Sequence, residues 1–453
     1  MLNLRASEVA LWTRGQLIGA DVTLRGVAID TRKIEGGELF VALQGEHQDG
    51  HAFVAAAAAA GAGAALVARR VDVDLPQVMV AETQMALGDL ASAVRAQHPT
   101  RVVGITGSNG KTTVKTLVAS ILKRHGRTHV NPGNLNNEIG LPLTLLAMPP
   151  DSEYAVLEMG AGKPGDIQYL AAIARPEVAL VNNIAPAHLE RMLSVEGIAQ
   201  TKGALYSALP GNGFAVINAD DAFADYFNEV ASGRQVLQFG LVKKADIHGE
   251  NLELGDTSRF VLQTPQGGIA IHLALPGRHN VMNALAASAI AYALQVPLSV
   301  IRDGLEAAEP VGGRLVATRV AAGWTLIDDS YNANPASTAA AIQVLMLGDR
   351  PGWLVLGDMR ELGPDAPRLH AEIGHLARQS GVARLYTVGS LAQAASEAYG
   401  SGSRHFSDQD SLLRALADDL APGIRCLVKG SRSSAMDRIV AALLQKGGSA
   451  HAA

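Results

Sequence analysis

The stretch Gly104-Ile105-Thr106-Gly107-Ser108-Asn109-Gly110-Lys111-Thr112-Thr113 follows a short apolar run and opens a helical pattern. Gly107 and Gly110 allow the backbone to curl so that amide N–H groups point inward, and the following helix turns its positive end to the same point. Lys111 would reach the β- and γ-phosphates of a nucleotide, and the Thr112 hydroxyl would hold a bridging magnesium ion. The stretch therefore predicts a phosphate-binding loop.

The residues on either side of this loop support that prediction. Val102 to Ile105 is a β-branched run typical of a strand. A helical stripe follows, with apolar residues spaced three and four apart: Val114, Leu117, Val118, Ile121 and Leu122. Strand, loop and helix in this order are the context that a phosphate loop requires. Ile105 stands where the usual pattern has its first glycine, so the loop is a variant form.

Length and composition restrict the class of protein. The 453 residues are too many for one hydrophobic core and predict about three domains. A net charge of −5 without a basic stripe argues against a nucleic-acid partner. The single Cys426 excludes an internal disulfide and indicates a reducing compartment. The Ala-rich stretch 52–68 is too short and too interrupted to span a bilayer, so we expect a cytoplasmic enzyme without stable membrane insertion.

Turn signals and periodicity divide the chain into three α/β units. Residues 1–98 predict a small mixed α/β domain. Residues 99–310 alternate strand and helix signals, which predicts a central domain with a parallel sheet carrying the phosphate loop. Beyond the linker signal Glu309 to Gly313, residues 311–453 alternate again without a Gly-x-Gly-x-x-Gly fingerprint, which predicts a doubly wound, Rossmann-like domain.

Short apolar runs give the individual strands. The clearest are Leu39–Leu43, Gln77–Val80, Val102–Ile105, Tyr154–Leu157, Val178–Val181, Thr325–Ile327, Trp353–Leu356, Leu385–Val388 and Cys426–Val428. A hairpin is predicted between Phe260–Leu262 and Ile269–Ile271, with the four residues 265–268 as its turn.

Polar residues follow two of the central strands. Glu158 comes directly after one, and His188 lies shortly beyond another. Open α/β sheets bind ligands at the carboxyl ends of their strands, on the same rim as the phosphate loop. Glu158 is therefore a candidate magnesium ligand, or else a strand-end carboxylate in solvent. His188 by itself is a weak signal.

Lys202 lies on an apolar helical stripe with Val195, Ile198, Leu205 and Leu209. A buried ammonium group is costly unless it is paired or neutralised. One interpretation is that the stem packs and the ammonium reaches water. The other is that burial neutralises the amine, which then reacts with carbon dioxide to form a carbamate able to share a magnesium ion with His188.

Asn280 and Asn283 are three apart near the start of another predicted helix. Residues at this spacing lie on one helix face. Their amides could contact an adenine edge or cap the helix.

Together these stretches resemble the Mur ligases of bacterial cell-wall synthesis, most closely the MurF type, which joins D-alanyl-D-alanine to UDP-N-acetylmuramoyl-tripeptide. The resemblance covers all three units, and the run Asp-Ser-Tyr-Asn-Ala-Asn-Pro at 329–335 favours the MurF type. It implies ATP-driven amide formation through an acyl phosphate, with ATP and two Mg²⁺ ions as cofactors. The sequence leaves the oligomeric state open, and we assume a monomer. Alternatives are another Mur-type or a folylpolyglutamate-type ligase, or a non-catalytic nucleotide-gated binding protein.

The resemblance also implies roles for individual residues. The expected ATP-binding residues are Gly107, Ser108, Asn109, Gly110, Lys111, Thr112, Thr113, Asn280, Asn283, Arg314, Asp329 and Tyr331. The expected substrate-binding residues are Thr31, Arg32, Asn134, Asn136 and Asn137. The expected magnesium ligands are Thr112, Glu158, His188 and a carbamylated Lys202, and the expected catalytic residues are Lys111, His188 and Lys202. Thr31 stands where the family more often has serine. Threonine retains the hydroxyl group of that serine.

Overall fold

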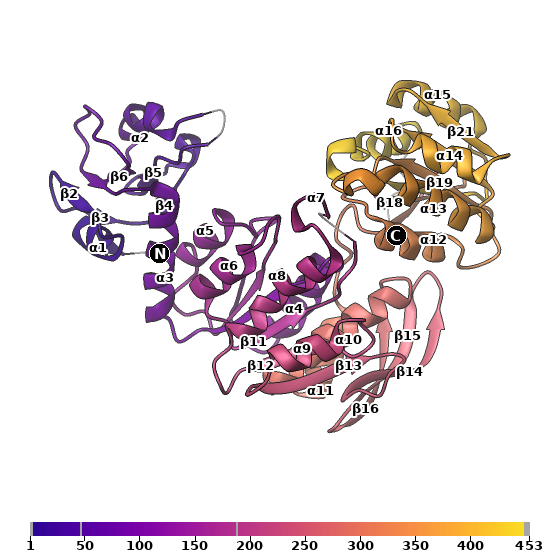
Figure 1. Cartoon of the computed structure of the whole chain (residues 1–453), viewed down its shortest axis with the longest axis horizontal. Coiled ribbons are helices and arrows are strands. Elements are labelled where there is room, and N and C mark those ends of the chain that lie inside the picture. The colour runs from indigo at the N-terminus through magenta and orange to yellow at the C-terminus, as the bar shows by residue number, and fades with distance from the viewer. Residues whose placement is uncertain (1–2, 46–47, 187–188, 448–453) are drawn as a thin grey trace.

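The computed structural model describes residues 3–45, 48–186 and 189–447, and three α/β parts follow one another along the chain (Figure 1). The long helix α3 (Thr83–Gln97) joins the indigo amino-terminal part to the central part. The orange-to-yellow carboxyl-terminal part lies against the central part on its other side. The mixed α/β architecture predicted from the sequence is confirmed. None of the helices within the described ranges is long and apolar enough to cross a bilayer.

The amino-terminal part contains a five-stranded sheet in the order β2-β7-β6-β5-β4. Only β2 is antiparallel to its neighbour. The elements of this part are β1 (Leu4–Arg5), α1 (Ala6–Trp12), β2 (Gln16–Ile18), β3 (Thr23–Leu24), β4 (Val27–Ala28), β5 (Leu39–Val41), α2 (Val54–Ala59), β6 (Ala64–Val67) and β7 (Gln77–Met79). Strands β5 and β6 are completely buried, as expected for apolar runs in a parallel sheet.

The central part is built on a nine-stranded sheet in the order β16-β15-β14-β13-β12-β11-β8-β10-β9. Its strands are β8 (Arg101–Thr106), β9 (Thr128–Val130), β10 (Tyr154–Glu158), β11 (Val178–Val181), β12 (Phe214–Asn218), β13 (Gln235–Gly240), β14 (Ile247–Leu254), β15 (Ser258–Thr264) and β16 (Gly267–Leu273). Strands β8 to β14 form parallel pairs, and β15 and β16 continue the sheet as antiparallel strands.

Helices cover both faces of this sheet. Their bounds are α4 (Lys111–Leu122), α5 (Gly140–Leu146), α6 (Asp166–Ala174), α7 (Leu189–Met192), α8 (Val195–Ser207), α9 (Ala224–Val230), α10 (Arg278–Ala293) and α11 (Leu298–Glu306). Side chains of α4, α10 and α11 form one apolar core with the sheet, and those of α5, α6 and α8 form another. Because alternate strand residues face opposite sides, Val103 belongs to the first core and Val102 to the second.

The predicted hairpin is present, but its turn is shorter than expected. Strand β15 extends to Thr264 and β16 begins at Gly267, which pair with each other. Only Pro265 and Gln266 remain in the turn, because Gly267 adopts a positive φ of 126° that lets the strand resume at once.

The carboxyl-terminal part has a six-stranded sheet in the order β17-β18-β22-β19-β20-β21. Its elements are β17 (Val316–Arg319), β18 (Thr325–Asp329), α12 (Pro335–Leu345), β19 (Gly352–Gly357), α13 (Ala366–Gln379), β20 (Arg384–Val388), α14 (Gln393–Tyr399), β21 (Ser403–Phe406), α15 (Gln409–Asp419), β22 (Arg425–Lys429) and α16 (Asp437–Gly447). Only the edge strand β17, which the sequence did not predict, is antiparallel. Cys426 is buried in β22, and burial raises the pKa of its thiol to about 12.

The strand register aligns the polar ends of three central strands. Ile105 of β8 pairs with Glu158 of β10, and Thr106 pairs with Val181 of β11. The phosphate loop, Glu158 and Asn182 therefore leave the sheet at the same edge, which is where such sheets bind ligands.

Candidate active site

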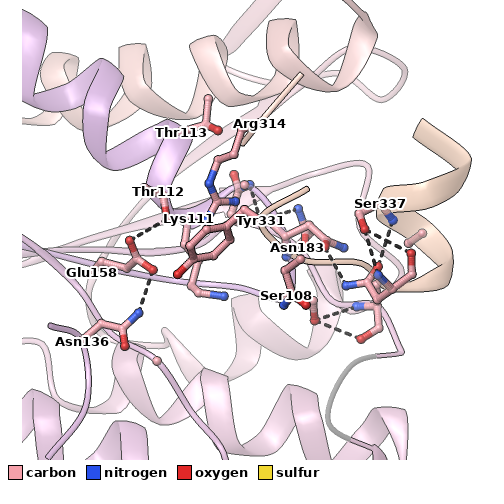
Figure 2. Close-up of a pocket in the computed structure, with 18 of the residues that line it drawn as sticks. Ser108, Lys111, Thr112, Thr113, Asn136, Glu158, Asn183, Arg314, Tyr331 and Ser337 are labelled. Carbon is pink, nitrogen blue, oxygen red and sulfur yellow. Dashed lines mark hydrogen bonds between the residues drawn. The ribbon is translucent and has the colours of Figure 1, made fainter. Parts of the chain in front are cut away.

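A cavity of about 760 Å³ opens at this edge of the central sheet. It is lined by the loop after β8, by the segment before α5, by the start of α10 and by residues of the carboxyl-terminal part. Figure 2 shows Lys111, Thr112 and Glu158 beside Arg314 and Tyr331, which come from a distant part of the chain. The cavity therefore combines two of the three α/β parts.

The phosphate loop is fixed to the strand beside it. The Asn109 N–H donates to Asn183 Oδ1 at 2.8 Å, and its C=O accepts from the side chains of Asn182 and Asn183 at 3.0 and 3.1 Å. Gly110 follows with a φ of 80° and forms the N-cap of α4. The sequence placed these asparagines after β11 but did not predict that they hold the loop.

Lys111 folds back over the loop, where its Nζ donates to Gly107 O at 2.8 Å. Burial lowers the pKa of Lys111, and the nearby Glu158 carboxylate opposes that shift. An anion bound in the loop would give this ammonium group a second charge partner.

Thr112 and Glu158 bring two oxygen ligands together. Thr112 Oγ1 donates to Glu158 Oε2 at 2.9 Å, and Asn136 Nδ2 donates to Glu158 Oε1 at 2.8 Å. Glu158 is only 3% exposed, so it is not a carboxylate in bulk solvent. Burial favours its neutral form, but the charges of Lys111 and Lys115, together with the hydrogen bonds from Asn136 and Thr112, lower its pKa. A hydroxyl beside an ionised carboxylate fits one magnesium ion, which prefers oxygen ligands.

Lys115 is a site residue that sequence reasoning missed. Its Nζ lies 3.3 Å from Glu158 Oε2 and donates to Asn131 O and Gly133 O. Lys115 is one helical turn beyond Lys111, and residues four apart share a helix face. That spacing was the available signal.

The structure answers one question about Lys202. Its side chain lies on α8 at 2% exposure, so the interpretation that the ammonium reaches water is wrong. Burial, reinforced by the charge of Lys111 and opposed by that of Asp166, lowers its pKa to about 7. Lys202 does not line the cavity itself. Lys111 and Asp166, whose charges act on its pKa, both line the cavity.

The second predicted magnesium site depends on His188, which lies outside the described residues. Among the residues that are described, no three His, Cys, Asp or Glu side chains gather closely enough to hold a metal ion. The pairing of His188 with a carbamylated Lys202 therefore stays a prediction.

The two asparagines on α10 do not cap it, because the N-cap is Gly277. Asn280 Nδ2 donates to Pro276 O at 2.8 Å, and Asn283 Nδ2 donates to Asn280 Oδ1 at 3.1 Å. Asn283 Oδ1 accepts from Asn182 Nδ2 at 3.0 Å. Both asparagines line the cavity and connect α10 to the wall that holds the phosphate loop.

The carboxyl-terminal part supplies Arg314, Tyr331 and Asp329 to the cavity. Arg314 Nη2 donates to Thr112 Oγ1 at 2.9 Å, and its guanidinium lies 4.5 Å from the centre of the Tyr331 ring (Figure 2). Asp329 accepts from Lys429 Nζ at 2.5 Å. The cavity thus has a cationic and aromatic wall that contacts the phosphate loop at Thr112.

The predicted substrate-binding residues fall into two groups. Asn134, Asn136 and Asn137 line the cavity near Glu158. Thr31 and Arg32 lie in a short 3-10 helix of the amino-terminal part and do not line it. Arg32 is exposed and pairs with Asp30 at 2.7 Å. The structure does not bring this pair to the phosphate loop.

Three stretches of the chain match Mur ligase domains. Residues 105–291 match the Mur ligase middle domain, and residues 313–432 match the domain described as Mur ligase, glutamate ligase domain. Residues 23–102 match the domain described as Mur ligase family, catalytic domain. The three matches follow the order of the three α/β parts.

Full-length relatives agree with these matches. The UDP-N-acetylmuramoyl-tripeptide--D-alanyl-D-alanine ligase of Escherichia coli (strain K12) is 45% identical over 99% of this chain and 100% of its own. The crystal structure of MurF from Acinetobacter baumannii is 35% identical, covers 98% of this chain and 99% of its own, and has a TM-score of 0.94. MurF ligase from Thermotoga maritima in complex with ADP is 27% identical, covers 93% of this chain and 97% of its own, and has a TM-score of 0.84. The chain belongs to the Mur ligase family.

Proposed function

We propose that this protein is an ATP-dependent amide ligase that joins D-alanyl-D-alanine to UDP-N-acetylmuramoyl-tripeptide, forming ADP and phosphate, for peptidoglycan precursor synthesis. The observation that carries the proposal is the convergence of a phosphate loop, a buried carboxylate and a cationic wall from another part of the chain on one cavity. The substrates of the full-length Escherichia coli relative and the ADP of the Thermotoga maritima structure support it.

The reaction needs activation of a carboxylate, which is a poor acylating agent. A carboxylate oxygen of the tripeptide attacks the γ-phosphoryl group, the bond to the β-phosphate oxygen breaks, and ADP leaves. The dipeptide amine then attacks the acyl carbon of this acyl phosphate, loses a proton, and displaces inorganic phosphate. Lys111 and the loop amides would stabilise the charge on the phosphoryl oxygens.

The wall of Arg314 and Tyr331 would cover the nucleotide from the opposite side. Because this wall belongs to the carboxyl-terminal part, its approach would exclude water from the acyl phosphate. Asn280 and Asn283 would contact the adenine side, and Asn134, Asn136 and Asn137 would contact the nucleotide-sugar peptide. We place the uridine end at Thr31 and Arg32 in the amino-terminal part.

Magnesium, when bound, would offset the charge that spreads over the transferring phosphoryl group. Thr112 and Glu158 would hold one ion, and His188 with Lys202 the other. Lys202 suits this role as a carbamate, because a pKa of about 7 leaves much of its amine neutral and able to attack carbon dioxide. The product is a carboxylate on the lysine nitrogen, and one proton is released. We also propose that the enzyme acts in the cytoplasm as a monomer.

The test is phosphate release from ATP, measured with the tripeptide nucleotide and with or without D-alanyl-D-alanine. Release that requires both substrates is expected. Phosphate release by the Lys202→Ala variant should be sharply lower than that of the parent. Added acetate should restore it in part, because acetate replaces the missing carboxylate. Lys123→Ala removes an exposed lysine next to α4 and serves as the matched control. Release that is indifferent to both substrates would instead favour another acid–amino-acid ligase or a nucleotide-gated binding protein.

A further inference from the structure

Both the Oδ1 and the Nδ2 of the Asn334 side chain form hydrogen bonds. It is the N-cap of α12, where its Oδ1 accepts from the Ser337 N–H at 2.9 Å. Its Nδ2 donates to Asn109 Oδ1 in the phosphate loop at 2.7 Å. At 9% exposure the amide is shielded from water that would compete for this bond. One side chain therefore caps a helix in the carboxyl-terminal part and contacts the phosphate loop of the central part.

The Asn109 end of this bond is held by the two asparagines that follow β11. The backbone N–H and C=O of Asn109 are both engaged by Asn182 and Asn183, as described above. Its side chain is left to face the carboxyl-terminal part, and its position follows the conformation of the loop. A change in the loop would alter the bond to Asn334.

A second bond between the two parts, from Arg314 to Thr112, has a different place in the chain. Arg314 comes directly after the linker at 309–313. The antiparallel pairing of β17 with β18 brings the chain back to this linker, where the Tyr331 N–H donates to Gly313 O at 3.1 Å. Asn334 follows three residues later and makes the other bond from the loop that leads into α12.

We propose that Asn334 is a positioning residue that couples closure of the carboxyl-terminal part to the conformation of the phosphate loop. It lines the cavity and acts through its bond to Asn109. A nucleotide that orders the loop would present Asn109 Oδ1 to Asn334 and favour the closed arrangement, and closure would tighten nucleotide binding in return. This inference rests on the proposed ATP site.

The informative variant is Asn334→Ser. Serine caps helices about as well as asparagine, but its hydroxyl is too short to reach Asn109. The variant should keep the cap of α12 and bind a non-hydrolysable ATP analogue about fivefold more weakly, as expected for loss of one hydrogen bond. Asp408→Ser places serine at another N-cap, that of α15, where the Asp408 carboxylate accepts from the Ser411 N–H at 2.8 Å. This control should leave binding unchanged.

A double-mutant cycle with Asn109→Ala identifies the partner. Alanine keeps the backbone groups that bond to Asn182 and Asn183 and removes the side-chain amide that carries the Oδ1 acceptor. Asn334→Ser should cause no further loss of affinity in the Asn109→Ala background. Unchanged affinity in Asn334→Ser, or losses that add, would overturn the coupling.

The binding assay also separates this inference from the proposed function. A parent protein that binds the analogue but releases no phosphate with the two substrates contradicts the ligase assignment alone. A parent protein that binds no analogue contradicts both.

Discussion

Lys115 Nζ and Glu158 Oε2 lie 3.3 Å apart, and both side chains are almost completely buried. The lysine comes from α4 and the glutamate from the end of β10, so the pair joins the phosphate-loop helix to the neighbouring strand. A carboxylate at this depth needs compensation, and the loss of one partner from a buried pair costs more than the pair contributes. The carboxylate proposed to hold magnesium is thus kept ionised by protein groups.

Replacing Lys115 by methionine removes the charge and keeps most of the side-chain volume. We expect the free energy of unfolding to fall by about 3 kcal/mol, because Glu158 keeps its hydrogen bonds but loses a cation. Urea denaturation measures this. The double variant Lys115→Met with Glu158→Gln should lose less free energy of unfolding than the two single variants lose in total. Strict additivity would show that the two groups are not coupled. Lys123→Met, at an exposed lysine, is the control.

Lys202 predicts a pH dependence of stability. Burial lowers its pKa from 10.5 to about 7 in the folded protein. Between these values the unfolded chain binds a proton that the folded protein does not, so this group makes stability rise as the pH rises from about 7 to 10.5. The slope is at most about 1.4 kcal/mol per pH unit. In buffers free of carbon dioxide, the stability of the parent relative to Lys202→Met should increase across this range. A constant difference would contradict the lowered pKa.

The sequence predicted much of the site because its signals are local. A strand, a glycine loop and a helix follow one another at 101–122, and Glu158 ends an apolar run, so parallel pairing alone places them together. Lys202 was recognised because a charge interrupted an apolar stripe. Helical periodicity predicted a position on a buried stripe. It did not predict that Lys202 is absent from the lining of the cavity.

The contacts between parts could not be predicted in the same way. The bond from Asn334 to Asn109 joins residues 225 positions apart, and no periodicity relates them. Strand β17 was missed because its residues alternate between half-buried and exposed and form no apolar run. The roles of Asn182 and Asn183 depend on the packing of β11 beside β8, which sets which side chains face the loop.

Gly110 is the position where the loop has no room for a side chain. A Cβ there would lie 2.5 Å from both Asn182 Nδ2 and Asn283 Oδ1, and its φ is 80°. We expect Gly110→Ala to weaken binding of an ATP analogue at least tenfold, because either the loop or the Asn182 and Asn283 side chains beside it must shift to relieve both contacts. Gly165→Ala is the matched control, since Gly165 is a helix N-cap with a φ of 89° and no atom near its Cβ position.

Calorimetric titration with the ATP analogue separates a loss of nucleotide affinity from a loss of stability. In both variants an alanine with a positive φ lowers the free energy of unfolding, by an amount of order 1 kcal/mol. Only Gly110→Ala should lose nucleotide affinity. Equal affinities for the two variants would contradict a role of the close packing around Gly110.

Arg425 forms two kinds of contact that should differ in energy. Its guanidinium donates to the carbonyls of Val344 and Leu347 near the end of α12, and it also lies 3.3 Å from Asp256 in the turn between β14 and β15. Asp256 is 84% exposed, so its ion pair is screened by solvent and should contribute less than about 0.5 kcal/mol. Arg425→Met removes the donor of the Leu347 carbonyl, whereas the Val344 carbonyl keeps the Leu347 N–H, and the change should cost about 2 kcal/mol. Urea denaturation of Arg425→Met and Asp256→Asn measures both, and a similar loss in the two variants would show that the ion pair between the parts carries the energy.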